Sequence, residues 1–316
     1  MLGWLLPLLV IGGLACLPVL AERRRHGADA FRAKAPGRFA RLSQGVTHYQ
    51  WFGEARGPVI VCVHGLTTPS PVWYSIAAGL TKLGYRVLVY DLYGRGFSDA
   101  PQGAQTGDFF AKQLEDLLEH QGLTGDVTLM GYSMGGSIVT HFSMLHPSRV
   151  TRLVLLASGG IWLREDKLTK VCRTIPFFGD WLHAVIAARK DRKALRAQLG
   201  QKFDITGIVE LQTAEYQSRG FLRSVLSSRR HMLNDVQEDA HRAIGREDIP
   251  VVAIWAEKDE IIPLKSLGTL TQWNRNSRQE VIPDADHSVG YTHSAQIVEV
   301  LRDALRDAAG QVNTGN

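Results

Sequence analysis

The chain has 316 residues, of which 45% are hydrophobic and 21% are charged, and its formal net charge is +5. This composition excludes wholesale disorder and is sufficient for the core of one large α/β domain or two small ones. Three widely spaced cysteines exclude a disulfide framework and a zinc site, and we expect no metal and no other cofactor.

Basic residues are concentrated in two stretches of the chain. Residues 22–41 contain seven Arg and Lys against two Asp and Glu, and residues 161–246 contain sixteen against ten. Two basic patches on an otherwise acidic chain fit an anionic membrane surface better than a nucleic acid, and no nucleic-acid-binding motif accompanies them. We therefore expect a membrane surface and no nucleic acid among the partners, while protein partners are not indicated by the sequence.

Residues 1–21 carry no charged side chain and are followed at once by Glu22-Arg23-Arg24-Arg25. A helix of this length spans about 31 Å, which is close to the thickness of the hydrocarbon core of a bilayer. We interpret this stretch as an uncleaved transmembrane anchor, and the arginines then place the following domain on the cytoplasmic side. The alternatives are a buried core helix or a cleaved signal peptide, and the latter would make the domain secreted or periplasmic.

The next part of the chain alternates between strand and helix patterns. Residues 22–37 form a basic stem, and residues 38–53 alternate around Gly45 as a β-hairpin does. Continuous apolar runs predict strands that are buried on both faces, and longer amphipathic stretches between them predict helices. The strands are expected at residues 58–63, 86–90, 126–130 and 150–156, and the helices at residues 72–83, 108–121 and 137–145.

The alternation stops after residue 158 and resumes near residue 247. Residues 159–246 have helical patterns and no convincing strand, so we predict a helical cap inserted into an α/β core of residues 38–158 and 247–309. The cap is expected to cover the carboxyl ends of the strands, where open α/β sheets bind their ligands. The later elements are strands at 249–255 and 279–282, helices at 263–272 and 294–309, and a polar tail at 310–316.

The motif Gly131-Tyr132-Ser133-Met134-Gly135 lies between a predicted strand and a predicted helix. Strand, tight turn and helix form the context in which G-x-S-x-G acts as a nucleophile elbow, with the serine exposed at the carboxyl edge of a sheet. Gly131 and Gly135 lack a Cβ, so the turn can close sharply. The simpler alternative is a glycine-rich turn with a surface serine.

A serine hydroxyl becomes a good nucleophile only when a base takes its proton and an acid orients that base. Asp259 follows the strand at 249–255, and His287 follows the strand at 279–282. The order Ser133, Asp259, His287 is the order nucleophile, acid, base of an α/β-hydrolase. Three further residues are weaker alternatives for the acid or the base: Glu257, Glu260 and His293.

These motifs together resemble the α/β-hydrolase superfamily over about residues 38–309. The matching marks are the elbow, the Asp259 and His287 loops, His64-Gly65, and Asp91-x-x-Gly94-x-Gly96-x-Ser98-Asp99. The resemblance implies an α/β-hydrolase fold, with a mostly parallel twisted sheet, helices on both faces and a helical cap. The anchor, stem and cap are also similar to membrane-anchored monoacylglycerol lipase-like members.

The resemblance also implies a role for each matching residue. Ser133 would be the nucleophile, His287 the general base and then acid, and Asp259 the residue that orients the imidazole. The backbone N–H groups of Leu66 and Met134 would bind the oxyanion. A serine at the elbow argues against haloalkane dehalogenases and epoxide hydrolases, which have an aspartate there.

An apolar helical stretch within the cap is followed directly by the mostly basic stretch Arg189-Lys190-Asp191-Arg192-Lys193. We identify it as a candidate lid: an apolar gate that meets lipid or lines an acyl pocket, with the basic residues at the lipid headgroups. The alternative is a cap helix that packs on the domain below. The candidate lid residues are Phe177, Phe178, Trp181, Leu182 and Val185.

The sequence therefore predicts a serine hydrolase of carboxylic esters that works through an acyl-enzyme. The expected substrates are small-molecule esters or lipids, acylglycerols above all. Two alternatives stay open. The same triad could serve a carbon–carbon bond hydrolase or a thioesterase, or the fold could be a catalytically silent binding module.

Overall fold

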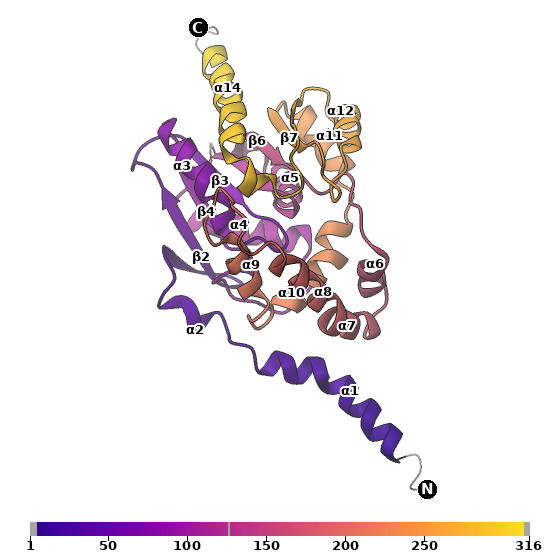
Figure 1. Ribbon diagram of the computed structural model, residues 1–316. Coiled ribbons are helices and arrows are strands. Elements are labelled where there is room, and N and C mark those ends of the chain that lie inside the picture. The colour runs from indigo at the N-terminus through magenta and orange to yellow at the C-terminus, as the bar shows by residue number, and fades with distance from the viewer. Residues whose placement is uncertain (1–4, 126, 313–316) are drawn as a thin grey trace.

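An eight-stranded sheet forms the centre of the computed structural model, in the order β1-β2-β4-β3-β5-β6-β7-β8 (Figure 1). The structure describes the backbone of residues 5–125 and 127–312 and the side chains of residues 12–125 and 127–305. Strand β2 is antiparallel to both neighbours, and all other pairs are parallel. The strands are β1 (Arg38–Leu42), β2 (Gly45–Phe52), β3 (Val59–Val63), β4 (Arg86–Tyr90), β5 (Val127–Tyr132), β6 (Val150–Leu156), β7 (Val251–Ala256) and β8 (Arg278–Ile282).

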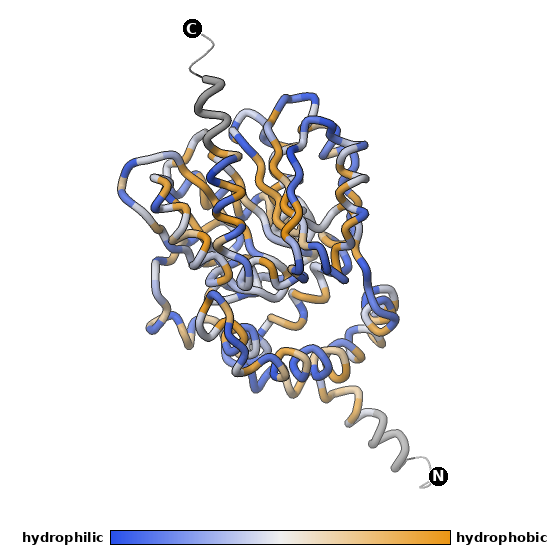
Figure 2. Tube along the Cα trace, turned by 45° about the horizontal axis from the view of Figure 1, so that its top comes forward, coloured by the Kyte–Doolittle hydropathy of each residue, from blue (hydrophilic) through white to orange (hydrophobic). Residues whose placement is uncertain are grey.

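Alternate side chains of the central strands enter two separate hydrophobic cores, one on each face of the sheet. In β3, Val61 and Val63 belong to one core, whereas Ile60 and Cys62 belong to the other. Because side chains of a strand point to opposite faces in turn, a strand covered on both sides must be apolar at every position. This explains the continuous apolar runs, which Figure 2 shows along the middle of the molecule.

Helices cover both faces of the sheet, as the sequence predicted. The first core is closed by α4, α5, α11 and α12, and the second by α3 and α14. Helix α11 lies in the stretch that we predicted as the end of the cap, but it packs against α5 and α12 of the core. The core helices are α3 (Tyr74–Lys82), α4 (Gly107–His120), α5 (Met134–Leu145), α11 (Glu238–Arg246), α12 (Lys265–Trp273), α13 (Val289–Thr292) and α14 (Ser294–Val312), with 3-10 turns η2 (Ser70–Trp73), η3 (Pro147–Arg149) and η5 (Met232–Asn234).

The predicted cap is an all-helical segment between β6 and β7. These two strands are neighbours in the sheet, so the chain leaves and re-enters the core at one place. In Figure 1 the cap helices gather at the lower end of the sheet. They are α6 (Lys167–Thr174), α7 (Phe178–Leu182), the π-helix η4 (His183–Ala187), α8 (Ala188–Arg196), α9 (Ile208–Glu215) and α10 (Phe221–Arg230).

The amino-terminal segment forms α1 (Leu5–Arg23) and the short α2 (Asp29–Arg32), and it contacts the cap. The indole N–H of Trp181 donates to the Leu14 carbonyl at 2.8 Å, and the Arg219 guanidinium donates to the carbonyls of Arg23 and Arg25. His26 and Ser218 form an isolated β-bridge. The stem is therefore attached to the cap by backbone groups as well as side chains.

The predicted anchor and tail lie partly outside the described residues. Residues 1–4 are not described, nor are the side chains of residues 5–11, which belong to the anchor, and of residues 310–316, which form the tail. Within the part of the chain that is described, none of the helices combines the length and the apolar character that crossing a bilayer requires.

Candidate active site

Ser133 stands at a sharp turn between β5 and α5. Its backbone has φ 54° and ψ −119°, a conformation that residues with a Cβ seldom adopt. The turn is possible because glycines surround it: a Cβ on Gly135 would lie 2.0 Å from the carbonyl oxygen of Val63, and one on Gly131 would lie 2.3 Å from the carbonyl oxygen of Gly135. The strand, turn and helix predicted from G-x-S-x-G are thus present.

The three predicted triad residues lie within hydrogen-bonding distance of one another. The Oγ of Ser133 is 2.9 Å from Nε2 of His287, and Nδ1 of His287 is 2.7 Å from Oδ2 of Asp259. The other carboxylate oxygen of Asp259 accepts from the backbone N–H groups of Ile261 and Ile262, both at 2.8 Å. With the proton on Nδ1 directed at Asp259, Nε2 is free to accept the serine proton.

Tyr132, next to the serine, holds the histidine from a second side. Its hydroxyl donates to the carbonyl of His287, and the two rings stack with centroids 5.6 Å apart. Burial raises the pKa of Tyr132 well above its usual value, so this phenol stays neutral as a donor. The motif placed a tyrosine beside Ser133, but only the fold shows that it supports the histidine loop.

The alternative acids and base are placed elsewhere. Glu257 accepts from the backbone N–H of Asp284, and His293 is hydrogen-bonded to Thr292. Glu260 lines the cavity beside the triad, but it is Asp259 that contacts the imidazole.

Two backbone N–H groups next to Ser133 are available for an oxyanion. Leu66 lines the cavity together with Ser133, and Met134 begins α5 directly after the serine. Within the described residues, neither N–H donates to a protein acceptor. His64 positions this loop: its Nδ1–H donates to the carbonyl of Gly65, and its Nε2 accepts from the N–H of Leu92. Burial lowers the pKa of His64 to about 4, so the ring is neutral.

A fully buried arginine, which sequence reasoning missed, connects the Leu66 loop to the cap. The Arg95 guanidinium donates to the Leu66 carbonyl at 3.0 Å, to Oε1 of Gln105 at 2.6 Å and to the hydroxyl of Ser228 on α10 at 2.8 Å. A buried charge must satisfy its donors within the protein, and here five acceptors from three segments do so. The Gly94-x-Gly96 motif gave the position of the loop but no indication of these partners.

A buried ion pair holds the base of the same loop. Nδ1 of His48 lies 2.7 Å from Oδ2 of Asp91, and both side chains are 1% exposed. Asp91 also accepts from the N–H groups of Ser70 and Phe97. The aspartate that begins the Asp91-x-x-Gly94 motif therefore fixes the surrounding backbone and does not contact the catalytic histidine.

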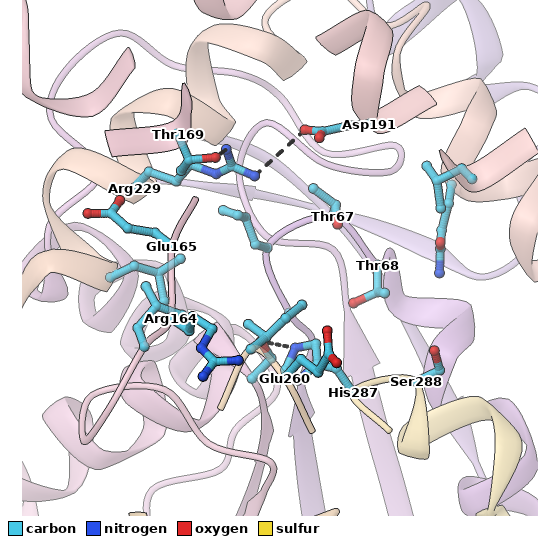
Figure 3. A pocket seen from close by; sticks show the side chains of 18 of the residues that line it. Thr67, Thr68, Arg164, Glu165, Thr169, Asp191, Arg229, Glu260, His287 and Ser288 are labelled. Carbon is cyan, nitrogen blue, oxygen red and sulfur yellow. Dashed lines mark hydrogen bonds and ion pairs between the residues drawn. The ribbon is translucent and has the colours of Figure 1, made fainter. Parts of the chain in front are cut away.

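A cavity of about 560 Å³ lies between the cap and the carboxyl ends of the strands, with Ser133 and His287 in its wall. Charged side chains surround much of it, as Figure 3 shows. Apolar side chains also line the cavity, among them Leu163, Leu195 and Leu233. The charged lining residues are Arg164, Glu165, Asp166, Arg173, Asp191, Arg229 and Glu260. Within the described residues, no cluster of three or more His, Cys, Asp or Glu is arranged to hold a metal ion.

The candidate lid residues are not among those that line this cavity. Phe177 is 90% exposed and Phe178 is 56% exposed. The cause is the direction of α7: Gly179 is buried against the backbone of Cys172, so Phe177 and Phe178 at the start of this turn face outward. The remaining candidates are half-buried: Trp181, Leu182 and Val185. Leu182 packs inside the cap against Cys172, Ala187 and Leu226.

The chain is similar to known proteins both in sequence and in structure. The family described as alpha/beta hydrolase fold matches residues 58–294. A pimeloyl-[acyl-carrier protein] methyl ester esterase from Photobacterium profundum is 26% identical, over 81% of this chain and 98% of its own length. A thermophilic esterase from Thermogutta terrifontis superposes with a TM-score of 0.69 at 20% identity, covering 86% of this chain and 99% of that one.

A solved structure of a membrane phospholipase A, described as a bacterial virulence factor, covers more of the chain. It superposes with a TM-score of 0.66 at 18% identity over 96% of this chain and 98% of its own. At such low identities the solved structures show the fold alone.

Proposed function

Since this chain belongs to the α/β-hydrolase family and is an esterase-type hydrolase, we propose that it cleaves carboxylic esters of lipids, such as acylglycerols, through an acyl-enzyme on Ser133. The observation that carries the reaction type is the hydrogen-bonded series Ser133, His287, Asp259 at 2.9 and 2.7 Å. This geometry is that of an activated serine nucleophile.

Each step of ester cleavage has a group in place. Nε2 of His287 takes the Oγ proton as Ser133 attacks the ester carbonyl, and Asp259 stabilises the imidazolium that forms. The oxyanion lies against the N–H groups of Leu66 and Met134, and loss of one such donor typically lowers kcat by about 10²–10³-fold. His287 then protonates the leaving alcohol, and a water activated by the same histidine releases the acid.

The lipid part of the proposal rests on the outer surface of the cap. Phe177 and Phe178 are exposed there, close to α1, which Trp181 contacts. Large exposed apolar side chains beside basic residues are typical of segments that lie in a membrane interface. A membrane phospholipase A shares the fold of this chain, which gives the proposal an analogy at the level of the fold.

For location, we propose that residues 1–21 anchor the protein in a membrane, with the hydrolase on the cytoplasmic side. The support is the uncharged sequence up to Ala21 and the arginines at 23–25 that follow it. Arginines next to an apolar helix favour the cytoplasmic face.

The reaction is tested with active-site variants and a fluorophosphonate probe. Ser133→Ala should lose both labelling and ester turnover while its circular dichroism spectrum is unchanged, because the triad acts as a unit. His287→Ala should fall about as far, and Asp259→Asn should keep some activity because the base is still present. Acyl esters of graded length, measured with the wild-type protein, then identify the preferred substrates. Hydrolysis by Ser133→Ala above a few per cent of the wild-type rate would disprove the assignment.

A further inference from the structure

Most charged side chains around the active-site cavity are already paired with one another. The Arg173 guanidinium binds both carboxylate oxygens of Glu165, at 2.6 and 3.1 Å. Arg229 faces Asp191 at 3.7 Å, as Figure 3 shows. Such pairs neutralise each other and help to hold α6, α8 and α10 together, so these groups are not free to bind a charged substrate.

Arg164 differs from the other arginines of the cavity. Within the described residues, no ion pair or hydrogen bond of its guanidinium is present, although the residue lines the cavity. Its backbone N–H donates to the carbonyl of Ile261 at 2.8 Å. Ile261 in turn donates to Asp259, so the backbone of Arg164 is attached to the loop that carries the triad acid. In Figure 3 the Arg164 side chain extends toward the His287 side of the cavity.

We propose that Arg164 binds an anionic group of the substrate, a phosphate or a carboxylate, while the ester bond lies at Ser133. A guanidinium presents a rigid fork of donors that matches both anions. The inference rests on the proposed ester hydrolysis and narrows its substrates from neutral esters to esters that carry a negative charge near the scissile bond.

Glu260 lines the same cavity as Arg164 and should weaken the binding of an anion there. It lines the cavity, and its carboxylate has no partner within the described residues. An anion at Arg164 is attracted by the guanidinium and repelled by this carboxylate. The two residues should therefore act in opposite directions on an anionic substrate, which a purely structural role would not produce.

The test uses three water-soluble esters with the same hexanoyl chain. They are 1-hexanoylglycerol, 1-hexanoylglycerol 3-phosphate and the hexanoyl ester of glyceric acid, which carry no charged group, a phosphate and a carboxylate. Short chains remove any contribution of membrane binding. The quantity compared is the ratio of kcat/KM for each charged ester to kcat/KM for the neutral one, in wild type and in the variants Arg164→Gln and Glu260→Gln.

We expect the wild-type protein to prefer at least one charged ester. Arg164→Gln should lower that ratio by about 10- to 100-fold, mainly through KM, as for the loss of a charged hydrogen bond. Glu260→Gln should raise it. Arg275→Gln is the control of equal charge: Arg275 is exposed before β8, at the end of the strand away from the triad, and this variant should match wild type. The charged ester whose kcat/KM ratio falls most in Arg164→Gln identifies the anionic group that Arg164 binds.

An unchanged ratio in Arg164→Gln, or a wild-type protein that prefers the neutral ester, would overturn the anion site. Neither result touches the proposed ester hydrolysis. That proposal fails separately, if wild type cleaves none of the three esters or if Ser133→Ala cleaves them at more than a few per cent of the wild-type rate.

Discussion

Ser133 holds its backbone conformation because its neighbours leave no other arrangement. The turn is enclosed by β3 on one side and by the first turn of α5 on the other, and the N–H of Ser133 donates to the carbonyl of Leu156 on β6. Strain of this kind persists only where the surroundings over-determine it. The glycines are therefore as necessary to the serine's position as the serine is to the chemistry.

Adding one methyl group at this turn tests that dependence. In Gly135→Ala the new Cβ meets the carbonyls of Val63 and His64, at 2.0 and 2.6 Å, and backbone cannot move aside as a flexible side chain can. We expect the free energy of unfolding of this variant, measured by urea denaturation, to be about 1–3 kcal/mol or more below that of wild type.

Gly268→Ala is the matched control for this change. Gly268 is exposed on α12 with nothing within 4 Å of the new Cβ. The same substitution should there stabilise the protein by about 0.5–1 kcal/mol through helix propensity. Equal effects at the two glycines would contradict the packing explanation.

The buried pair of His48 and Asp91 should make stability depend on pH. Burial alone would raise the pKa of Asp91, but the hydrogen bond and charge of His48 outweigh it and lower that pKa to about 2. Burial alone would lower the pKa of His48, but the hydrogen bond and charge of Asp91 raise it above 6.5. The Asp91 contribution is thus lost as the pH falls toward about 2, and the His48 contribution is lost as the pH rises through its raised pKa.

We therefore expect His48→Gln to be most destabilising between about pH 4 and pH 6.5, where both contributions are complete. The difference from wild type should shrink as the pH rises further. Urea unfolding of both proteins at several pH values measures this. If the difference in the free energy of unfolding is the same from acidic to alkaline pH, the pair stabilises the fold through packing and not through its charges.

The sequence could point to the candidate triad residues because each of them follows a recognisable strand. Ser133, Asp259 and His287 lie at carboxyl ends of strands, and parallel strands bring those ends to one edge of the sheet. Arg95 and Arg164 could not be assigned in this way. Their roles depend on which acceptors the cap and the loops bring near them, and this is decided by tertiary packing.

At the level of single elements, the helix α7 illustrates the same limit. The spacing of its apolar residues predicted a helical segment, which is present as α7 followed by η4. It could not show which face is buried, because Gly179 packs closely on α6 and this contact turns Phe177 and Phe178 outward. Periodicity identifies an apolar face, but the buried face is selected by the neighbour that fits best.

The outward face gives a prediction about lipid substrates. Phe178→Asp places a charge on an exposed surface, so the fold and the triad should be unaffected. If this face enters a membrane interface, turnover of long-chain acylglycerols in vesicles should fall several-fold, because each buried CH₂ contributes about 0.8 kcal/mol to membrane binding. Turnover of a water-soluble short-chain ester is the internal control. Equal losses for both substrates would remove the support for a lipid-facing cap.

At the level of the whole molecule, the amino-terminal segment and the hydrolase are separable in sequence but in contact in space. We expect a protein lacking residues 1–21 to be folded, active on a soluble ester and stable in solution without detergent. It keeps Glu22, whose carboxylate accepts from the N–H of Gly220, and Arg23 and Arg25, whose carbonyls bind Arg219. Among the described residues, it loses the hydrogen bond from the Trp181 indole to the Leu14 carbonyl and the contacts of α1 with η4.

The full-length protein should stay with the membrane fraction in alkaline carbonate, whereas the shortened one should not. Fractionation followed by an activity assay measures both. A full-length protein that washes off, or whose mature chain begins at Glu22, would contradict the anchor.

The position of the cap between β6 and β7 has a consequence for recombination. Since the cap begins after β6 and ends before β7, and these strands are adjacent, a cap from a relative could replace it without any change in the order of the strands. The seam is not inert, however: Arg95 of the core is bound by Ser228, and Gly96 donates to the buried Glu215 of α9. A grafted cap that lacks these residues would leave the buried Arg95 guanidinium, beside the Leu66 loop, without its acceptors from the cap. Chimaeras that fold should therefore take the Asp91–Asp99 loop and the cap from the same parent protein.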